Sequence, residues 1–413
     1  TNKLSIDSSL AHDVFSFLLI VKLAGDSPET LVVSTNSIEL AEQVRDWADK
    51  KDVRVITLVK RSGKIKGFLK RYTPAGIIRA FLRTLIFWFL SRPYRPPTNS
   101  TGLDLAIVSL THNSSFSLPN AYRDVYFGPL VDHLADSGVN GMVLGLIQER
   151  PMQQFKHLKQ IKSGVPVRPV ESYLTVSAIL ACGFKALWLF LRPLRVRHPI
   201  EIDGLDLSRL ISQTVTQNCR NGEIFMSLRI FYAAQRLGRL AHMNRCIYPF
   251  ENRSWEKMLI MGIRTTSPDT QIAAYQHASL TPSHTNMLME LEEAQIAPFP
   301  NIILTTGEIT KDWMEREGNY PLGIFRTACA LRQGQPDQLR APVTNENLSK
   351  ILVAFSANLE QTVNTLEFLG EAFGNQENYD IRLRAHPTLP IKSASEIVPS
   401  DHSGYYSEST ASL

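Results

Sequence analysis

Polar side chains follow two predicted buried strands in the middle of the chain. Glu251 comes shortly after an apolar run that ends at Tyr248, and a carboxylate placed there can take a proton from a hydroxyl or hydrogen-bond a polyol. His277 follows the run that ends at Tyr275, and its imidazole, which titrates near neutral pH, can serve as a general base. We therefore take Glu251 and His277 as the candidate catalytic residues, although Glu251 could serve only to bind a polyol and His277 could instead bind a phosphate.

The side chains beside these two residues are of types that bind a sugar or a polyol. Tyr248 and Trp255 offer flat apolar faces on which a sugar ring can stack. Asn252 and Gln276 place amide groups next to the two expected catalytic residues. The alternative is an ordinary helix start after the strand, since asparagine is also a good N-cap, and a histidine that is no more than a satisfied polar group.

A third polar cluster lies near the end of the sequence and is suited to phosphate. Alternation along a predicted strand places Arg382 and Arg384 on one face, and guanidinium groups pair well with phosphate. The alternative is an edge strand whose arginines are solvated. The predicted nucleotide- or phosphate-binding residues are Ser356, Asn358, Arg384 and His386.

These clusters need strands to position them, and strand-like and helix-like segments alternate along the sequence. Apolar runs predict strands at residues 30–35, 53–59, 104–110, 141–147, 245–248, 270–275, 302–305, 351–355 and 379–384. Amphipathic spacing predicts helices at residues 37–50, 122–137 and 359–373. This alternation predicts an α/β fold with parallel sheets that are covered on both faces, and such sheets bind ligands at the carboxyl ends of their strands.

A polar stretch at residues 332–350, rich in Gln, Pro and Asn, looks like a linker between two domains. The first α/β domain is predicted to span residues 1–335 and the second residues 345–413. The second has room for two or three strands, so we expect it to be truncated. The active site is predicted in the cleft between the two domains, with Glu251 and His277 on one side and Ser356, Arg384 and His386 on the other.

The positive charge of the protein is concentrated in one segment. The chain of 413 residues has a formal net charge of +5, yet residues 60–95 hold ten basic side chains and no acidic one, and the remainder holds 34 basic against 39 acidic residues. A protein that binds nucleic acid along its length would spread its positive charge more widely. We therefore expect one local anionic contact and no nucleic-acid partner.

Two apolar runs, residues 76–90 and 174–191, each contain a tryptophan and lead into Arg-Pro. Both are shorter than the roughly 20 residues that a transmembrane helix needs, but an apolar helix flanked by basic residues can lie flat among anionic headgroups. We expect residues 64–95 and 174–197 to contact an anionic membrane. Because the first residues lack the pattern of a secretion signal, the expected location is cytoplasmic, peripheral on the inner face of the cell membrane. The alternative is two buried helices whose arginines reach solvent.

Several classes of function lack their sequence signatures. The chain has no Walker loop, no GxGxxG and no kinase motif, so nucleotide hydrolysis and dinucleotide redox chemistry have no support. The four cysteines show no CxxC spacing, and His277 and His284 lack the spacing of metal ligands. We expect no metal and no cofactor.

The polar clusters resemble motifs of bacterial surface-carbohydrate glycosyltransferases of the GT-B type. This group includes capsule Kdo-transferase-like and CDP-glycerol glycerophosphotransferase-like enzymes. In chain order the motifs are YRDVYFG at residues 122–128, YPFENRSWE at 248–256, YQHA at 275–278 and RLRAHP at 382–387.

The resemblance implies two Rossmann-like domains that face a cleft, the first on the acceptor side and the second binding a nucleotide sugar. It implies that His277 acts as base, that His386 contacts the nucleotide phosphates, and that Arg123 and Asp124 belong to the acceptor site. The implied activity is metal-independent transfer of a sugar from a nucleotide-activated donor to a lipid-linked or growing surface glycan, in capsule or lipopolysaccharide biosynthesis. A polyol-phosphate transferase of the same fold and a non-catalytic, membrane-associated glycan-binding scaffold are the alternatives.

Overall fold

The computed structural model of the chain divides into two compact units, residues 1–332 and 333–413. The structure describes residues 10–25, 30–59, 74–97, 102–116, 120–147, 151–161, 164–192, 199–220, 222–281, 284–331, 349–355, 358–373, 379–385, 391 and 407–408.

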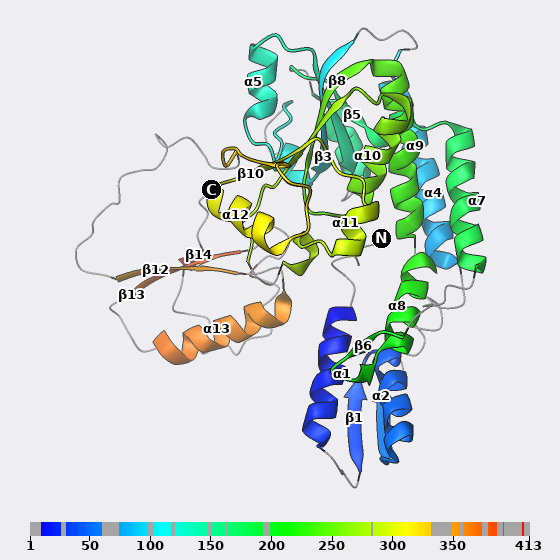
Figure 1. The fold of residues 1–413 in the computed structure, drawn as a ribbon. Coiled ribbons are helices and arrows are strands. Elements are labelled where there is room, and N and C mark those ends of the chain that lie inside the picture. The colour runs from blue at the N-terminus through cyan, green and yellow to red at the C-terminus, as the bar shows by residue number, and fades with distance from the viewer. Residues whose placement is uncertain are drawn as a thin grey trace. The chain divides into compact units, whose positions relative to one another are not determined.

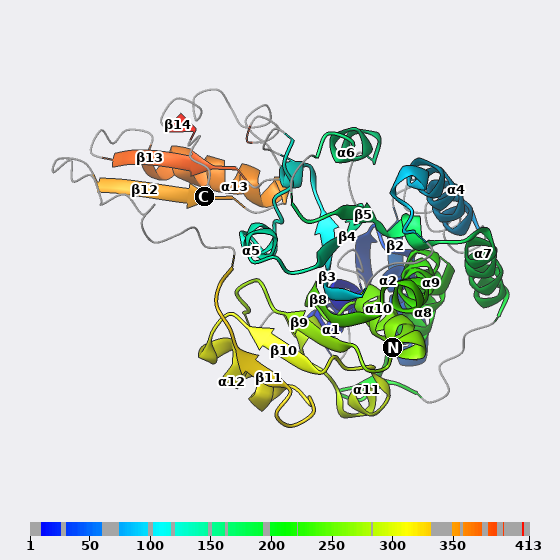
Figure 2. The same cartoon turned by 90° about the horizontal axis from the view of Figure 1, so that it is seen from above.

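A seven-stranded sheet forms the centre of the first unit (Figure 1, Figure 2). Its strands are β3 (Leu103–Thr111), β4 (Gly141–Ile147), β5 (Val167–Pro169), β8 (Met243–Pro249), β9 (Gln271–Tyr275), β10 (Ile302–Thr305) and β11 (Phe325–Thr327). The spatial order is β5-β4-β3-β8-β9-β10-β11, and every pairing is parallel. The predicted strands at 104–110, 141–147, 245–248, 270–275 and 302–305 are confirmed, as is the mixed α/β class.

Both faces of this sheet are buried, which is why its strands read as continuous apolar runs. In β3, Ala106 and Val108 enter one hydrophobic core while Ile107 between them enters the other. The first core is shared with α7 (Val176–Leu191), α9 (Glu223–Ala241), α10 (Ser254–Thr266) and α12 (Glu308–Glu317). The second is shared with α5 (Leu130–Asp136) and α6 (Pro151–Leu158), and α4 (Ala75–Leu90) contributes to both.

The helices α9 and α10 approach each other closely because of a glycine. A Cβ added at Gly262 of α10 would lie 2.5 Å from the carbonyl oxygen of Phe231 and 2.7 Å from the Cβ of Ala234, both in α9. Around the large sheet the structure also contains α11 (Leu291–Ile296) and the short 3-10 segments η1 (Arg92–Tyr94), η2 (Asn113–Phe116), η3 (Val170–Tyr173) and η4 (Thr285–Met287).

The strand order changes direction between β3 and β8. From β3 the chain adds β4 and β5 on one side, and it then returns to add β8, β9, β10 and β11 on the other side. The loops that leave the carboxyl ends of β3 and β8 therefore run in opposite directions. In open parallel sheets this switch point is where a crevice for a ligand forms.

A separate small sheet is formed by the first predicted β-α-β segment. β1 (Leu31–Thr35) and β2 (Val55–Val59) pair in parallel with each other and do not join the large sheet. They share a core with α1 (Leu10–Ala24), α2 (Ile38–Lys51) and α8 (Ser208–Arg220), and the hairpin β6 (Glu201–Ile202) and β7 (Leu205–Asp206) precedes α8. The predicted β-α-β elements at 30–59 are confirmed, and α1, α2 and α8 complete a core that is separate from that of the large sheet.

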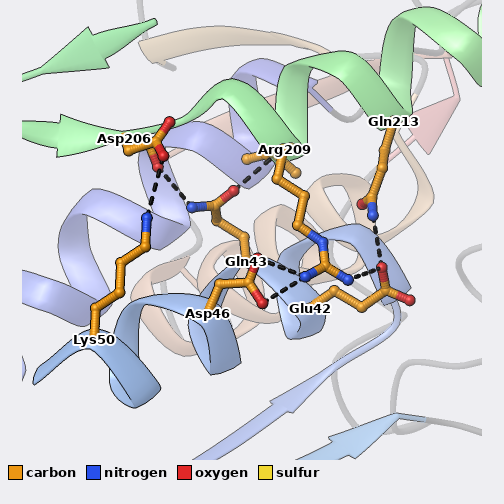
Figure 3. Close-up of polar contacts among 8 residues, drawn as sticks. Glu42, Gln43, Asp46, Lys50, Asp206, Arg209 and Gln213 are labelled. Atoms are coloured by element: carbon orange, nitrogen blue, oxygen red, sulfur yellow. Dashed lines mark hydrogen bonds and ion pairs between the residues drawn. The ribbon is translucent and has the colours of Figure 1, made fainter. Parts of the chain in front are cut away.

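The contact between α2 and α8 is polar at its rim (Figure 3). The buried side chain of Gln43 donates to the carbonyl oxygen of Asp206 at 2.7 Å and accepts from the backbone N–H of Leu210 at 3.0 Å. Arg209 forms ion pairs with Glu42 and Asp46 beside it. These contacts join residues more than 150 positions apart in the chain, so this small core depends on two distant segments.

The helix predicted at residues 122–137 is wrong in its first half, because only Leu130–Asp136 is helical. The carboxylate of Asp124 accepts from the backbone N–H of Tyr126 at 2.8 Å and of Phe127 at 2.9 Å. A turn held in this way satisfies amides that a helix would otherwise pair. Gly128 then takes a positive φ of 53°, and the helix starts only after it.

The second unit contains a three-stranded parallel sheet in the order β12 (Ser349–Ala354), β13 (Tyr379–Arg384), β14 (Ser407–Glu408). The helix α13 (Leu359–Phe373) packs its apolar face on this sheet. The strands predicted at 351–355 and 379–384 and the helix predicted at 359–373 are confirmed.

A buried ion pair inside the first core offers a test of the fold. Glu171 of η3 pairs with Arg229 of α9, and the two residues are 0% and 2% exposed. Removing one partner leaves a charge buried without compensation, so Glu171→Ala should lower the free energy of unfolding by about 3–5 kcal/mol in urea unfolding. The control Lys311→Ala breaks an exposed pair with Glu308 and should cost less than about 1 kcal/mol. Equal losses in the two variants would contradict the buried pair.

Candidate functional site

The carboxyl ends of three neighbouring strands bring together the polar residues of the candidate site. His112 follows β3, Glu251 follows β8 and His277 follows β9. β3 and β8 are the two strands at which the strand order changes direction. The site therefore lies where an open parallel sheet is expected to bind a ligand.

Glu251 lies between a guanidinium group and an imidazole. Its Oε2 is 2.5 Å from Nε of Arg253, and its Oε1 is 3.6 Å from Nε2 of His277. The first contact is a close ion pair, while the second is wider than a hydrogen bond. The Glu251 side chain is 24% exposed and that of His277 is 6% exposed, so of this pair the carboxylate is the more accessible to a ligand.

Two aromatic residues extend this cluster toward β3. The ring of Tyr126 meets the ring of His277 edge to face at a centroid distance of 4.6 Å. The hydroxyl of Tyr126 is 3.1 Å from Nε2 of His112. The imidazole of His277 is thus held between a carboxylate on one strand end and a tyrosine from the loop after β3.

The backbone of Glu251 is fixed on both sides. Its N–H donates to Oε1 of Glu256 at 3.0 Å, and its carbonyl oxygen accepts from Nδ2 of Asn286 at 3.0 Å. Asn252, which has a positive φ of 56°, donates in return from its Nδ2 to the carbonyl oxygen of Asn286 at 3.0 Å. The predicted acceptor residue Asn252 is 2% exposed, and in the structure it shapes the turn that presents Glu251.

Gln276 has a similar structural role for His277. It is 1% exposed, and its Oε1 accepts from the backbone N–H of Thr306 at 3.2 Å and from its hydroxyl at 3.1 Å. This contact ties the turn after β9 to the end of β10. In the structure the side-chain oxygen of Gln276 thus fixes the position of the residue that precedes His277.

The two residues that the YRDVYFG motif assigned to the acceptor site differ in exposure. Asp124 is buried, and its carboxylate accepts from the hydroxyl of Tyr122 at 2.7 Å in addition to the two backbone amides of the turn. Its role is to shape the turn that carries Tyr126. Arg123, in contrast, is exposed.

The predicted stacking residues lie mainly in the core. Tyr248 is fully buried, because it belongs to β8 and its side chain points into the first hydrophobic core, where burial raises its pKa well above the usual value. Its ring packs edge to face against Trp255 at 6.0 Å. No face of Tyr248 is open to a sugar, which corrects that expectation, while Trp255 is partly exposed.

Two hollows flank the sheet of the first unit. One, of about 350 Å³, is lined by Leu280, Ile309, Trp313 and Arg316, and Leu280 belongs to the same loop as His277. The other, of about 580 Å³, lies at the opposite, amino edge and is lined by residues that include Asp104 and Arg245. Polar side chains, among them Thr281 and Asp312, also line the hollow on the His277 loop.

In the second unit, the described phosphate-binding candidates follow two neighbouring strands. Arg384 ends β13, where it pairs in register with Ala354 of β12, and it is partly buried. Asn358 precedes α13, and its Oδ1 accepts from the backbone N–H of Gln361 at 3.1 Å. Arg382 pairs with Asp380 at 2.9 Å. Ser356 and His386 lie outside the described residues.

Three residues of the cluster were not predicted as site residues. His112 follows a predicted strand directly, so the rule that led to His277 applies to it as well. Tyr126 and Arg253 lie inside the motifs at 122–128 and 248–256, but only the pairing of distant strands shows that they meet Glu251 and His277. Among the residues that the structure describes, no group of three or more His, Cys, Asp or Glu side chains could hold a metal ion.

The buried carboxyl of Glu256 gives the site a testable pH dependence. Burial raises its pKa from 4.5 to about 8. The folded protein then binds more protons than the unfolded chain between these two values, so its stability falls as the pH rises from 4.5 to 8.

Glu256→Gln keeps an oxygen for the N–H of Glu251 and removes the titration. We expect urea unfolding of this variant to show a smaller loss of stability across that range, by on the order of a few kcal/mol. Glu292→Gln, at an exposed carboxylate, is the control and should leave the profile unchanged. Parallel profiles for Glu256→Gln and the parent protein would refute the raised pKa.

A scan against models of known protein families finds no match to this chain. A search of curated proteins finds no similar sequence either.

Proposed function

We propose that the protein transfers a sugar from a nucleotide-activated donor to a hydroxyl of a lipid-linked or growing glycan, as a glycosyltransferase of the GT-B type. The observation that carries this proposal is the pairing of Glu251 with His277 at adjacent strand ends beside the switch point of the sheet. The motif resemblance supports the same reaction class. The first unit would bind the acceptor and the second the nucleotide.

The acceptor hydroxyl would lose its proton to the Glu251–His277 pair. Glu251 is the more exposed partner, so its carboxylate is the group that would contact the hydroxyl. Nε2 of His277 lies 3.6 Å from Oε1 of the same carboxylate, so His277 would take the proton on from Glu251. Arg253 would hold the second carboxylate oxygen in place, which keeps the first oxygen directed at the substrate.

The donor side needs groups that stabilise the leaving nucleotide. As the acceptor oxygen bonds to the anomeric carbon, the bond from that carbon to the phosphate oxygen breaks and the nucleotide keeps the electron pair. Arg384 and the N-terminus of α13 lie at the same carboxyl edge of the second sheet, and both favour bound phosphate.

Substitution of the proposed pair should abolish transfer without unfolding the protein. Glu251→Gln and His277→Asn should each reduce nucleotide release from a panel of CMP-, CDP-, UDP- and GDP-sugars, with glycolipid as acceptor, by at least about 100-fold. Glu292→Gln and His284→Asn are the matched controls, since His284 lies a few residues further along the chain and is exposed. Full activity of Glu251→Gln or of His277→Asn would refute the catalytic role of the substituted residue. If the protein instead turns over CDP-glycerol and none of the sugar donors, its activity is polyol-phosphate transfer and not glycosyl transfer.

Nucleotide binding can be tested separately by thermal shift with CMP, CDP, UDP and GDP. A nucleotide at about 100 times its dissociation constant should add about 2.7 kcal/mol of stability. Arg384→Ala should remove this shift, while Arg382→Ala, on the same strand but already paired with Asp380, should retain it. If no nucleotide stabilises the parent protein, the donor site is refuted and a non-catalytic glycan-binding role is favoured.

A further inference from the structure

The helices α4 and α7 are apolar on two opposite faces. Each buries one face in the core that it shares with α9. The other face stays exposed, and its apolar side chains recur every three or four residues, so they form one continuous stripe along each helix. The stripe of α4 consists of Ile78, Leu82, Ile86 and Phe89, and that of α7 of Val176, Leu180, Phe184, Leu187, Trp188 and Leu191.

The two stripes belong to one surface, which we call the α4–α7 surface. The two helices pack side by side and both pack on α9 (Figure 1, Figure 2). Nε1 of Trp88, near the end of α4, donates to the carbonyl oxygen of Leu174, just before α7, at 3.0 Å. The end of α4 therefore meets the start of α7, so the helices are antiparallel. Because their inner faces enter the same core, their stripes point away from it together.

Paired arginine and tryptophan side chains mark both ends of this surface. At the end of α4, the guanidinium groups of Arg92 and Arg95 lie 5.9 Å and 4.7 Å from the ring centroid of Trp88. At the end of α7, Arg192 lies 5.0 Å from that of Trp188. Since the helices are antiparallel, these pairs lie at opposite ends of the surface.

The two segments that form the surface carry positive charge only. Residues 74–97 and 174–192 hold six basic and no acidic side chains.

We propose that the α4–α7 surface docks flat on a bilayer that contains anionic phospholipid. The apolar stripes would enter the boundary between headgroups and acyl chains, and the arginines would meet lipid phosphates. Tryptophan prefers this boundary, and anchors at both ends of the surface hold it parallel to the bilayer. Among the described helices, none is long and apolar enough to cross a membrane.

The charge of the surface decides between lipid and protein as its occupant. A second copy of this chain, packed on the same surface by two-fold symmetry, would bring together two surfaces whose exposed charged side chains in residues 74–97 and 174–192 are all basic. They are Arg79, Arg92, Arg95, Lys185 and Arg192. Like charges at a buried contact are unfavourable, whereas an anionic headgroup layer complements them. This proposal does not depend on the proposed reaction, although a membrane-bound protein is well placed to meet a lipid-linked acceptor.

Vesicle flotation tests the proposal directly with the full chain. The protein should float with vesicles of phosphatidylcholine containing about one third phosphatidylglycerol, and much less with phosphatidylcholine alone. The double variant Phe89→Gln with Phe184→Gln removes two side chains that are 60% and 71% exposed and should weaken binding to the anionic vesicles at least about tenfold. Arg92→Gln with Arg192→Gln should weaken it too, and more so at low salt than at high salt.

Two matched controls make the result decisive. Met152→Gln and Leu322→Gln change apolar residues that are 65% and 103% exposed elsewhere in the first unit, and each should leave binding unchanged. Thermal unfolding of all variants should match the parent protein, because the changed side chains contact solvent. Absence of flotation by the parent protein, or undiminished flotation by the double variant, would overturn the proposal. A parent dimer that the double variant converts to a monomer, without vesicle binding, would show that the surface is a contact between copies.

Discussion

The common direction of the seven strands in the large sheet is the constraint on which the candidate site depends. Because all strands run parallel, their carboxyl ends lie at one edge, and any polar residue that follows a buried strand is delivered to that edge. The change of direction between β3 and β8 then separates the loops that leave these strands. His112, Glu251 and His277 meet beside this point although 165 residues (277 − 112) separate the first from the last.

Much of the polar sequence around the candidate site fixes the backbone beside Glu251 and His277. Glu256 accepts from the backbone N–H of Glu251 and Asn286 donates to its carbonyl oxygen, while Asn252 holds Asn286 in turn. Gln276, directly before His277, is bonded to Thr306 at the end of β10. Groups held in this way do not need to be ordered when a substrate arrives, which lowers the cost of reaching the reactive geometry. The motif residues that resemble an acceptor site are thus largely its supports.

The sequence predicted the strands, and hence Glu251 and His277, because buried parallel strands appear as uninterrupted apolar runs with polar residues at their ends. It did not predict which strands are neighbours, since that depends on contacts between distant segments, so the places of Arg253 and Tyr126 beside this pair came only from the structure. The residue type alone gave a wrong prediction for Tyr248, because an aromatic ring can stack on a sugar but this one is buried in the core. The turn at Asp124 replaced half of a predicted helix because one carboxylate satisfies its amides.

A structure of the protein with a nucleotide sugar and a short glycan bound would test the central claim most directly. The account predicts a glycan hydroxyl within hydrogen-bond distance of the Glu251 carboxylate, on the side of Oε1 that faces His277, and the donor phosphate on Arg384. A glycan bound at the amino edge of the sheet, in the hollow lined by Asp104 and Arg245, with Glu251 and His277 in contact with neither substrate, would contradict it.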